Sequence, residues 1–360
     1  MSVSGSLLER ARTAGTPIID GEQAVFIWQG DDDPPLLVGD FTNWTERPIA
    51  LEEREPGVWA AAVALPRNAY VEYAFIRRFR EGEEDSDIDE RVIDPLNPRL
   101  QYNGVSAMNN TFTMPGFAPS ALTQRDKGVK RGKISTHQIF GDALGGSHRL
   151  LYLYHPPVDS PTPLVVVWDG PDYLNRASLN IIVDNLIAQG RIRPIALAMI
   201  HNAHQGRFTE YLQNEATVGF AVHELLPFAR KHLNLLDEGE QPGCHGVLGA
   251  SMGGLMALYA GLRASQVFGQ VISQSGAFHI APNDERMLID DLIALIPPPP
   301  LKIWQDVGQI EWLLDGNRRM HTQLTERGYD VSYLEHAGGH NFPMWSQVVG
   351  KALETIFPPG

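Results

Sequence analysis

The stretch Gly246–Gly254 reads GVLGASMGG, and the apolar run LMALYAGL follows it at 255–262. The residues before Ser251 predict a short buried strand, and those after it predict a helix. Glycines two positions to either side of the serine permit the sharp turn of a nucleophile elbow, which exposes the hydroxyl and aims the backbone N–H of Met252 at a developing oxyanion. A glycine-rich turn without chemistry shares the short pattern, but the flanking strand and helix favour Ser251 as a nucleophile.

The rest of the carboxyl-terminal part predicts the sheet to which this turn belongs. Buried strands that alternate with helices are typical of a parallel sheet covered on both faces. Alternating segments at 132–140 and 148–154 predict antiparallel edge strands in front of that sheet. We therefore expect a mostly parallel α/β fold with a site at the carboxyl ends of its strands. The apolar runs lie at 163–168, 195–200, 246–250, 269–273 and 301–305, and the helical patterns at 176–189, 216–233, 254–264 and 315–327.

The amino-terminal part has a different pattern. Short strand-like segments occupy 22–115, with turn residues at intervals of roughly eight to twelve positions and no long helical pattern. This spacing predicts a small all-β sandwich. We therefore expect an amino-terminal helix or arm at 1–21, the sandwich domain at 22–115, a linker at 116–131 and the α/β domain at 132–360.

A serine nucleophile needs a general base and a carboxylate that orients this base. His340 is the candidate base, because it follows the last predicted strand in the glycine loop AGGHNF; a surface loop histidine is the alternative interpretation. The carboxylate is expected after the strand at 301–305, because the chain order in this fold class is serine, acid, histidine. Glu311 is the first candidate there. Asp315, which also suits a helix N-cap, and Asp306 at the strand end are the alternatives.

The loop after the strand at 164–168 is expected to supply a second backbone donor to the oxyanion, and Gly170 and Tyr173 are the candidates. His201, Arg207 and Glu210 follow the next strand and are expected at the rim of the site. Arg207 and Glu210 fit either an anion clamp or a loop salt bridge. The histidines of this loop lack a third ligand at suitable spacing, so no metal site is expected.

The composition limits the class of protein and its partners. The chain has 360 residues, a formal net charge of −14 and a pI near 5.3. This charge argues against a nucleic-acid partner. Cys244 is the single cysteine, so no intrachain disulfide is expected. The sequence begins without a signal-peptide pattern and has no apolar stretch of about twenty residues, so we expect a cytoplasmic protein without a membrane partner.

At these motifs the chain resembles the esterase D branch of the α/β-hydrolases, and within it the enterochelin esterase group. The resemblance covers nearly the whole chain, because segments of the amino-terminal part resemble the immunoglobulin-like domain of that group, which is itself similar to carbohydrate-binding modules. The segments that carry the resemblance are Val166–Gly170, Arg207–Leu212, Gly249–Gly254 and Gly338–Asn341 with Trp345, and in the amino-terminal part Val38–Trp44, Asp94–Pro98 and Met114–Gly116.

The resemblance implies a cytosolic serine esterase that hydrolyses the ester bonds of a trilactone catecholate siderophore and needs no cofactor. By this resemblance Ser251 is the nucleophile, His340 the base and Glu311 the acid. Arg207 is placed against the anionic catecholate, and Phe278 and Trp345 are placed in the substrate site.

Two other functions compete with this interpretation. The same machinery suits a feruloyl or acetyl esterase that acts on sugars, with Trp28, Trp44 and Trp59 of the front domain as a sugar platform, although such residues more often belong to a sandwich core. A non-catalytic binding protein with a hydrolase shape is the second alternative, and the complete set of serine, histidine and carboxylate argues against it. The oligomeric state stays open, with a homodimer as one option.

Overall fold

A computed structural model describes residues 6–30, 33–77, 90–104, 107–279 and 286–360. By their contacts the residues divide into two compact units, which we describe separately. Unit 1 comprises Met1–Pro119, Gly308–Trp312 and Ala337–Asn341, and unit 2 comprises Ser120–Val307, Leu313–His336 and Phe342–Gly360. Within the described residues, no helix is both long enough and apolar enough to cross a membrane.

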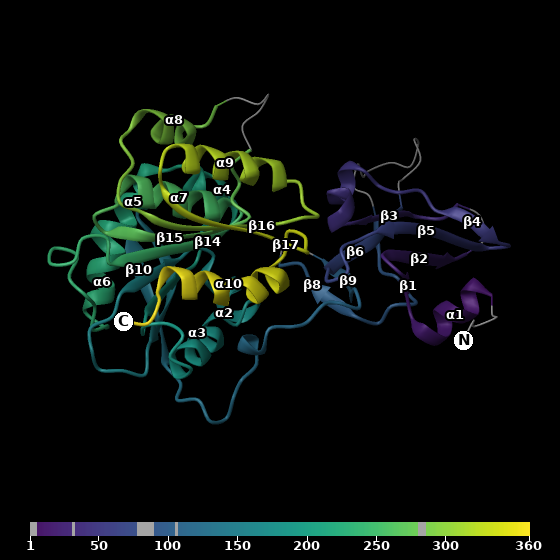
Figure 1. Cartoon of the computed structure of the whole chain (residues 1–360), viewed down its shortest axis with the longest axis horizontal. Coiled ribbons are helices and arrows are strands. Elements are labelled where there is room, and N and C mark those ends of the chain that lie inside the picture. Colours follow the sequence, from purple (N-terminus) through teal and green to yellow (C-terminus); the bar gives the residue numbers. More distant parts are fainter. Residues whose placement is uncertain (1–5, 31–32, 78–89, 105–106, 280–285) are drawn as a thin grey trace. The chain divides into compact units, whose positions relative to one another are not determined.

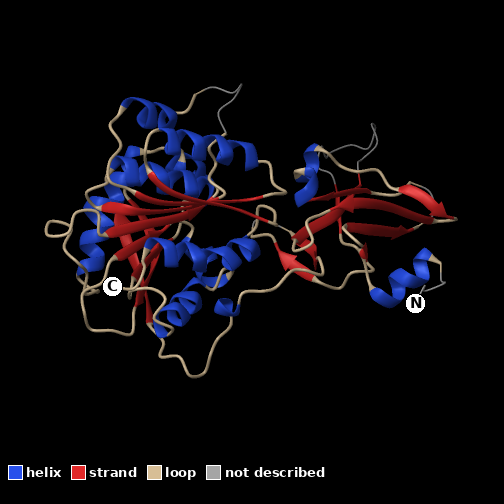
Figure 2. Ribbon diagram, viewed as in Figure 1, coloured by secondary structure: helices blue, strands red, loops and turns tan. Residues whose placement is uncertain are grey.

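Unit 1 is built largely from antiparallel strands (Figure 2). One sheet has the order β1-β2-β5-β4, and the other has the order β3-β6-β9-β8 with β7 paired to β6. The elements are α1 (Leu7–Ala14), β1 (Ile18–Asp20), β2 (Gln23–Gln29), β3 (Leu36–Gly39), η1 (Asp40–Thr42), η2 (Trp44–Glu46), β4 (Glu52–Glu55), β5 (Val58–Ala64), β6 (Tyr70–Arg77), β7 (Glu90–Val92), β8 (Leu100–Tyr102) and β9 (Met108–Thr113).

Aromatic side chains from both sheets form the core of unit 1. Phe26 of β2 packs edge-on against Tyr73 of β6 and Phe112 of β9, at ring-centroid distances of 4.8 and 5.6 Å. All three side chains are buried. Offset and edge-to-face contacts of this kind are the favoured arrangement of aromatic rings. Unit 1 therefore contains two β-sheets that share one apolar core.

Unit 2 is built around a mixed sheet of order β10-β11-β13-β12-β14-β15-β16-β17, flanked by helices (Figure 1). Its strands are β10 (Lys133–Gly141), β11 (Ser147–His155), β12 (Leu164–Val167), β13 (Ala196–Ile200), β14 (His245–Ala250), β15 (Phe268–Gln274), β16 (Lys302–Gly308) and β17 (Asp330–His336). Its helices are η3 (Ala121–Thr123), α2 (Gly170–Asn175), α3 (Leu179–Ala188), η4 (His204–Gly206), α4 (Arg207–Tyr211), α5 (Glu215–Phe220), η5 (Ala221–Leu225), α6 (Leu226–Arg230), α7 (Met252–Arg263), α8 (Leu288–Leu295), α9 (Leu314–Glu326) and α10 (Phe342–Ile356).

The strand directions refine the expected parallel sheet. The pairs β13–β12, β12–β14, β14–β15 and β15–β16 are parallel, whereas β10–β11 and β11–β13 are antiparallel. The sheet as a whole is therefore mixed. The β10–β11 pair is antiparallel because these two strands form a hairpin, as their alternating sequence predicted, and a hairpin joins neighbouring strands in opposite directions.

The apolar runs of the central strands are explained by burial on both faces. Leu164 and Val166 of β12 pack in a core with helices α6, α7 and α9, whereas Val165 and Val167 pack in a second core with α3 and α10. Successive side chains of a strand point to opposite faces, so a strand covered on both sides needs apolar residues at every position. Figure 1 shows α7 and α9 on one face of the sheet and α3 and α10 on the other.

The helix expected at 216–233 is interrupted. It consists of α5, the π-helical turn η5 and α6. Pro227 lies in the first turn of α6 and has no N–H to donate to the preceding turn, which accounts for a local change in the hydrogen-bond pattern.

Candidate active site

Ser251 lies at the turn between β14 and α7, in a backbone conformation that L-residues rarely adopt. Its φ is 59° and its ψ is −123°. The turn is held by backbone hydrogen bonds, because the Ser251 N–H donates to the carbonyl of Gln274 at 2.9 Å and its carbonyl accepts from Ala277 at 3.0 Å. A Cβ at Gly249 would lie 2.2 Å from the carbonyl oxygen of Gly253, so the turn requires glycine there. Strained residues of this kind cluster at functional sites.

Two helices of unit 2, α2 and α7, begin close to the ends of strands. Met252 is the first residue of α7 and Gly170 is the first residue of α2, so neither N–H has an acceptor within its own helix. The N–H of Tyr173, by contrast, donates to the carbonyl of Asp169 at 3.3 Å. A Cβ at Gly170 would lie 2.2 Å from the carbonyl carbon of Met199, so a larger residue does not fit.

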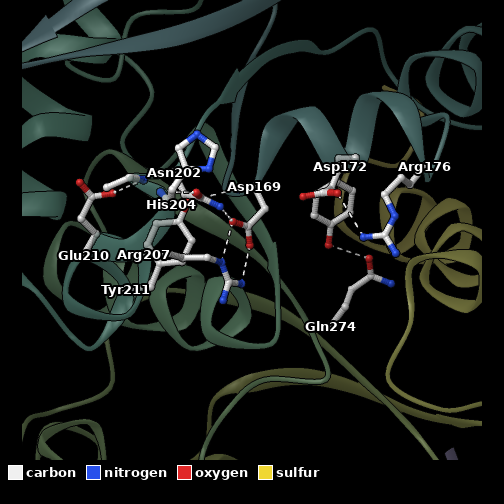
Figure 3. A network of polar contacts seen from close by, with 11 residues as sticks. Asp169, Asp172, Arg176, Asn202, His204, Arg207, Glu210, Tyr211 and Gln274 are labelled. Carbon is white, nitrogen blue, oxygen red and sulfur yellow. Dashed lines mark hydrogen bonds and ion pairs between the residues drawn. The ribbon is translucent and has the colours of Figure 1, made fainter. Parts of the chain in front are cut away.

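Asp169 immediately precedes α2 and is the centre of a polar network (Figure 3). Arg207 binds it through two hydrogen bonds, from Nε to Oδ1 at 2.8 Å and from Nη2 to Oδ2 at 2.6 Å. Asn202 Nδ2 donates to Oδ1 at 2.6 Å, and the Asp169 N–H donates to the hydroxyl of Tyr211 at 3.2 Å. These contacts hold the loop that carries Gly170.

The charge of Arg207 is compensated by Asp169. Burial by itself lowers the pKa of Arg207, but the hydrogen bonds and negative charge of Asp169 outweigh it, so this pKa is raised. The guanidinium also stacks over the Tyr211 ring at 5.2 Å. Arg207 and Glu210 do not pair with each other, because Glu210 pairs with Arg149 and accepts from the N–H of Ala203.

The remaining predicted rim and substrate residues differ in exposure. His201 Nδ1 contacts the carbonyl oxygen of Asn202 at 2.8 Å, and its ring lies 4.5 Å from that of His204. Phe278 is completely buried in the core of unit 2, and Trp345 is buried with its Nε1 donating to Ser275 Oγ at 2.9 Å. Across the described residues, no group of His, Cys, Asp and Glu has an arrangement that could hold a metal ion.

His340 and Glu311 lie side by side in unit 1. The distance from His340 Nδ1 to Glu311 Oε2 is 3.3 Å, and the Glu311 side chain is fully buried. The Trp312 ring covers the imidazole at a centroid distance of 4.5 Å. The two segments are joined through their backbones, because the N–H of Ile310 donates to the carbonyl of Gly338 at 3.2 Å.

The other two candidate carboxylates have different surroundings. Asp306 is buried in unit 2, where Trp304 Nε1 donates to its Oδ2 at 2.6 Å and Gln274 Nε2 donates at 3.2 Å. The Asp315 side chain is 96% exposed and has an Arg318 nitrogen at 3.7 Å. Of the three candidates, Glu311 is the one whose carboxylate contacts His340 within unit 1.

Sequence reasoning did not single out Asp169, Asn202 or Tyr211 as site residues. Asp169 and Arg207 are 38 positions apart, and no periodic pattern links them. The one available signal was the position of Asp169 directly after the apolar run 164–168. A charged residue buried at such a position needs a partner, but the sequence does not show which residue this partner is.

The chain is similar to known esterases. The Esterase family, described as "Putative esterase", matches residues 141–355. The iron(III) enterobactin esterase of Dickeya dadantii is 30% identical over 55% of this chain, and the iron(III) salmochelin esterase of Escherichia coli O6:H1 is 26% identical over 70%. The matched segments span 49% and 64% of those two relatives.

A solved structure has the same fold. The ferric enterobactin esterase of Salmonella typhimurium superposes with a TM-score of 0.75 and 21% identity, over 93% of each chain. The family match at 141–355 covers well over half of the 360 residues and includes Ser251, Glu311 and His340. The chain therefore belongs to this esterase family.

Proposed function

We propose that the chain is a serine carboxylic-ester hydrolase with Ser251 as its nucleophile. The observation that carries the proposal is the conformation of Ser251, whose positive φ between β14 and α7 is the strained geometry of a nucleophile elbow. Membership of the esterase family supports it. In the first step the Ser251 hydroxyl oxygen attacks the ester carbonyl to form a tetrahedral intermediate, and expulsion of the alcohol from this intermediate leaves the acyl-enzyme.

His340 is the proposed general base and acid. Its Nδ1 faces Glu311, which leaves Nε2 to accept the proton of Ser251 and then to return it to the leaving alcohol. Water attacks the acyl-enzyme in the second step, with the same imidazole as base. Glu311 orients the ring and stabilises the imidazolium that forms. The exposure of Asp315 and the Trp304 bond to Asp306 support this choice of acid.

Met252 and Gly170 are the proposed donors to the oxyanion. Both begin a helix, so their N–H groups point away from the helix and carry its partial positive charge. Tyr173 is the weaker of the two candidates in the α2 loop, because its N–H already donates to Asp169.

The proposed substrate is the ester of a catecholate trilactone siderophore. The names of the Dickeya and Escherichia relatives, iron(III) enterobactin and iron(III) salmochelin esterase, support this class of substrate. Arg207, Glu210 and His201 are the proposed rim residues, to which the exposed Phe208 of α4 adds an apolar surface. Phe278 and Trp345, the other two proposed substrate residues, are both buried.

The sugar esterase is less well supported. Ferulic acid esterases match 63–67% of this chain at TM-scores of 0.53–0.55, whereas the enterobactin esterase fold matches 93%. Trp28 packs against Phe75 at 5.2 Å in the unit 1 core, and Trp59 packs against the same core. We propose an immunoglobulin-like domain at 22–115, a linker at 116–131 and a hydrolase domain at 132–360, in a cytosolic protein, consistent with its single buried cysteine.

An ester panel tests the proposal. The full chain is assayed with p-nitrophenyl acetate, with enterobactin with and without iron, and with a feruloyl sugar; Ser251→Ala is the control. We expect turnover of the trilactone and fluorophosphonate labelling that is absent in the variant. No turnover of any ester together with no labelling would instead support a non-catalytic binding protein. Preference for the feruloyl sugar would overturn only the siderophore assignment.

A further inference from the structure

Asp40, at the corner after β3, packs against the segment that carries His340. The residue is 2% exposed. Its Oδ2 accepts a hydrogen bond from the Glu72 N–H at 2.9 Å and another from Asn341 Nδ2 at 3.2 Å. A Cβ at Gly339 would lie 2.0 Å from Cγ of Asp40, so the carboxyl group occupies the space beside the residue that precedes His340.

The same segment is joined by its backbone to two other parts of unit 1. The N–H of Tyr70, at the start of β6, donates to the carbonyl of Ala337 at 3.2 Å, and Tyr70 forms a parallel bridge with Gly338. The carbonyl of Gly338 accepts from Ile310, next to Glu311. The segment 337–341 is therefore joined both to β6 and to the segment 308–312, and the Asp40 side chain packs against its middle.

Asp40 is buried beside other acidic side chains. Burial, followed by the charges of Glu72 and, more weakly, Glu311, raises the pKa of Asp40 well above its ordinary value. Tyr70 also faces this group of carboxyls, and its own pKa is raised by burial and by the charges of Glu72 and Asp40. Glu311, the carboxyl with the weaker effect on Asp40, is the one that contacts His340.

We propose that Asp40 is a positioning residue for ester hydrolysis, and that it holds the segment 337–341 so that His340 stays against Glu311. This inference rests on the proposed function. A small displacement of a catalytic group, of about 1 Å, can lower a rate by about 100-fold, so a residue that contacts only the adjacent backbone is able to affect turnover.

Replacement of Asp40 tests the inference on the full chain with p-nitrophenyl acetate. Asp40→Ala should lower kcat by about 10- to 100-fold and leave KM within about twofold, because positioning affects the reacting groups and not the binding surface. Asp40→Asn keeps an acceptor for the Glu72 N–H in an uncharged side chain, and should recover at least about a third of the wild-type kcat. A role that requires the negative charge would predict no such recovery.

Asp94→Ala is the matched control. Asp94 is another buried carboxyl of unit 1, with its hydrogen bonds to Thr16, Tyr73 and Leu96. Its loss should lower the melting temperature without changing kcat. Gly339→Ala is the second variant if Asp40→Ala does not fold. Its added methyl would clash with the Asp40 carboxyl, so it should displace the segment and lower kcat similarly.

The outcomes separate the inference from the proposed function. An active wild type with an inactive Ser251→Ala supports the hydrolase. If folded Asp40→Ala and folded Gly339→Ala then keep full kcat, or if Asp94→Ala lowers kcat as much as they do, the positioning role is overturned and the hydrolase stands. A wild type without esterase activity overturns both.

Discussion

Replacement of Arg207 is the sharpest test of how the loop after β12 is held. Arg207 makes two charge-assisted hydrogen bonds to Asp169, the residue that precedes Gly170. Without the guanidinium, the Asp169 side chain keeps the amide of Asn202 but has no positive partner in the network that Figure 3 shows. We therefore expect Arg207→Ala to lower both stability and turnover, and Arg207→Lys to do so less, because a lysine cannot bind in the bidentate mode.

The magnitude follows from the burial of the two partners. Breaking a fully buried ion pair costs about 3–5 kcal/mol. The Asp169 side chain is only 4% exposed, but that of Arg207 is 30% exposed, so water replaces part of the lost interaction. We expect the free energy of unfolding to decrease by about 2–3 kcal/mol in Arg207→Ala and by about 1–2 kcal/mol in Arg207→Lys. Loss of one oxyanion donor lowers kcat by about 100- to 1000-fold, and a loosened Gly170 should lower it by about 10- to 100-fold.

The assay combines urea unfolding with kinetics on a neutral and an anionic ester. Unfolding is followed by two probes, because a chain of two units need not unfold in one step. Arg318→Ala is the matched control. Arg318 makes a bidentate pair with Glu335 in the same unit, at 2.7 and 2.9 Å, but its side chain is 51% exposed. An exposed pair contributes at most about 1 kcal/mol, and kcat should not change in this variant.

Two results would refute this reasoning. If Arg207→Ala raises KM for the anionic ester alone and leaves kcat for the neutral ester intact, Arg207 is an anion clamp for the substrate and does not hold the loop. If Arg207→Ala and Arg318→Ala lose equal stability, the burial of Asp169 has no energetic consequence.

The remaining predictions concern the acid, the nucleophile and pH. Glu311→Gln should lower kcat by at least about 100-fold, whereas the exposed Asp315→Asn should stay within about twofold; parallel kinetics compare them. Ser251→Ala should retain the wild-type circular dichroism spectrum and lose all turnover. Burial lowers the pKa of His245 from 6.5 to about 4. Between these two pH values the unfolded chain binds more protons than the folded chain, so the free energy of unfolding decreases as the pH is lowered. In urea titrations, the decrease in unfolding free energy from pH 7 to pH 5 should be about 1–2 kcal/mol smaller in His245→Asn than in the wild type.

Local features of the sequence determined the elements that surround Ser251. The glycines at 249 and 253 predicted the sharp turn because a turn depends on residues that are close together in the sequence. The structure shows that a side chain does not fit at Gly249. The apolar runs predicted the central strands because a strand buried on both faces needs an apolar residue at every position. The mixed order of the sheet is less evident from the sequence, since strand direction depends on how distant segments pair.

Contacts between distant segments were decided by the tertiary structure alone. Asp306 lies in β16, and Glu311 and Asp315 follow it closely in the sequence. Only burial and distance show that Glu311 lies beside His340 while Asp315 is exposed. Asp40 and Asn341 are 301 positions apart. Periodicity and turn signals report a residue's own neighbours along the chain, whereas a buried charge obtains its partner from whichever segment the packing brings next to it. The sequence by itself therefore determined which residues are capable of the chemistry, and the packing decided which of them meet.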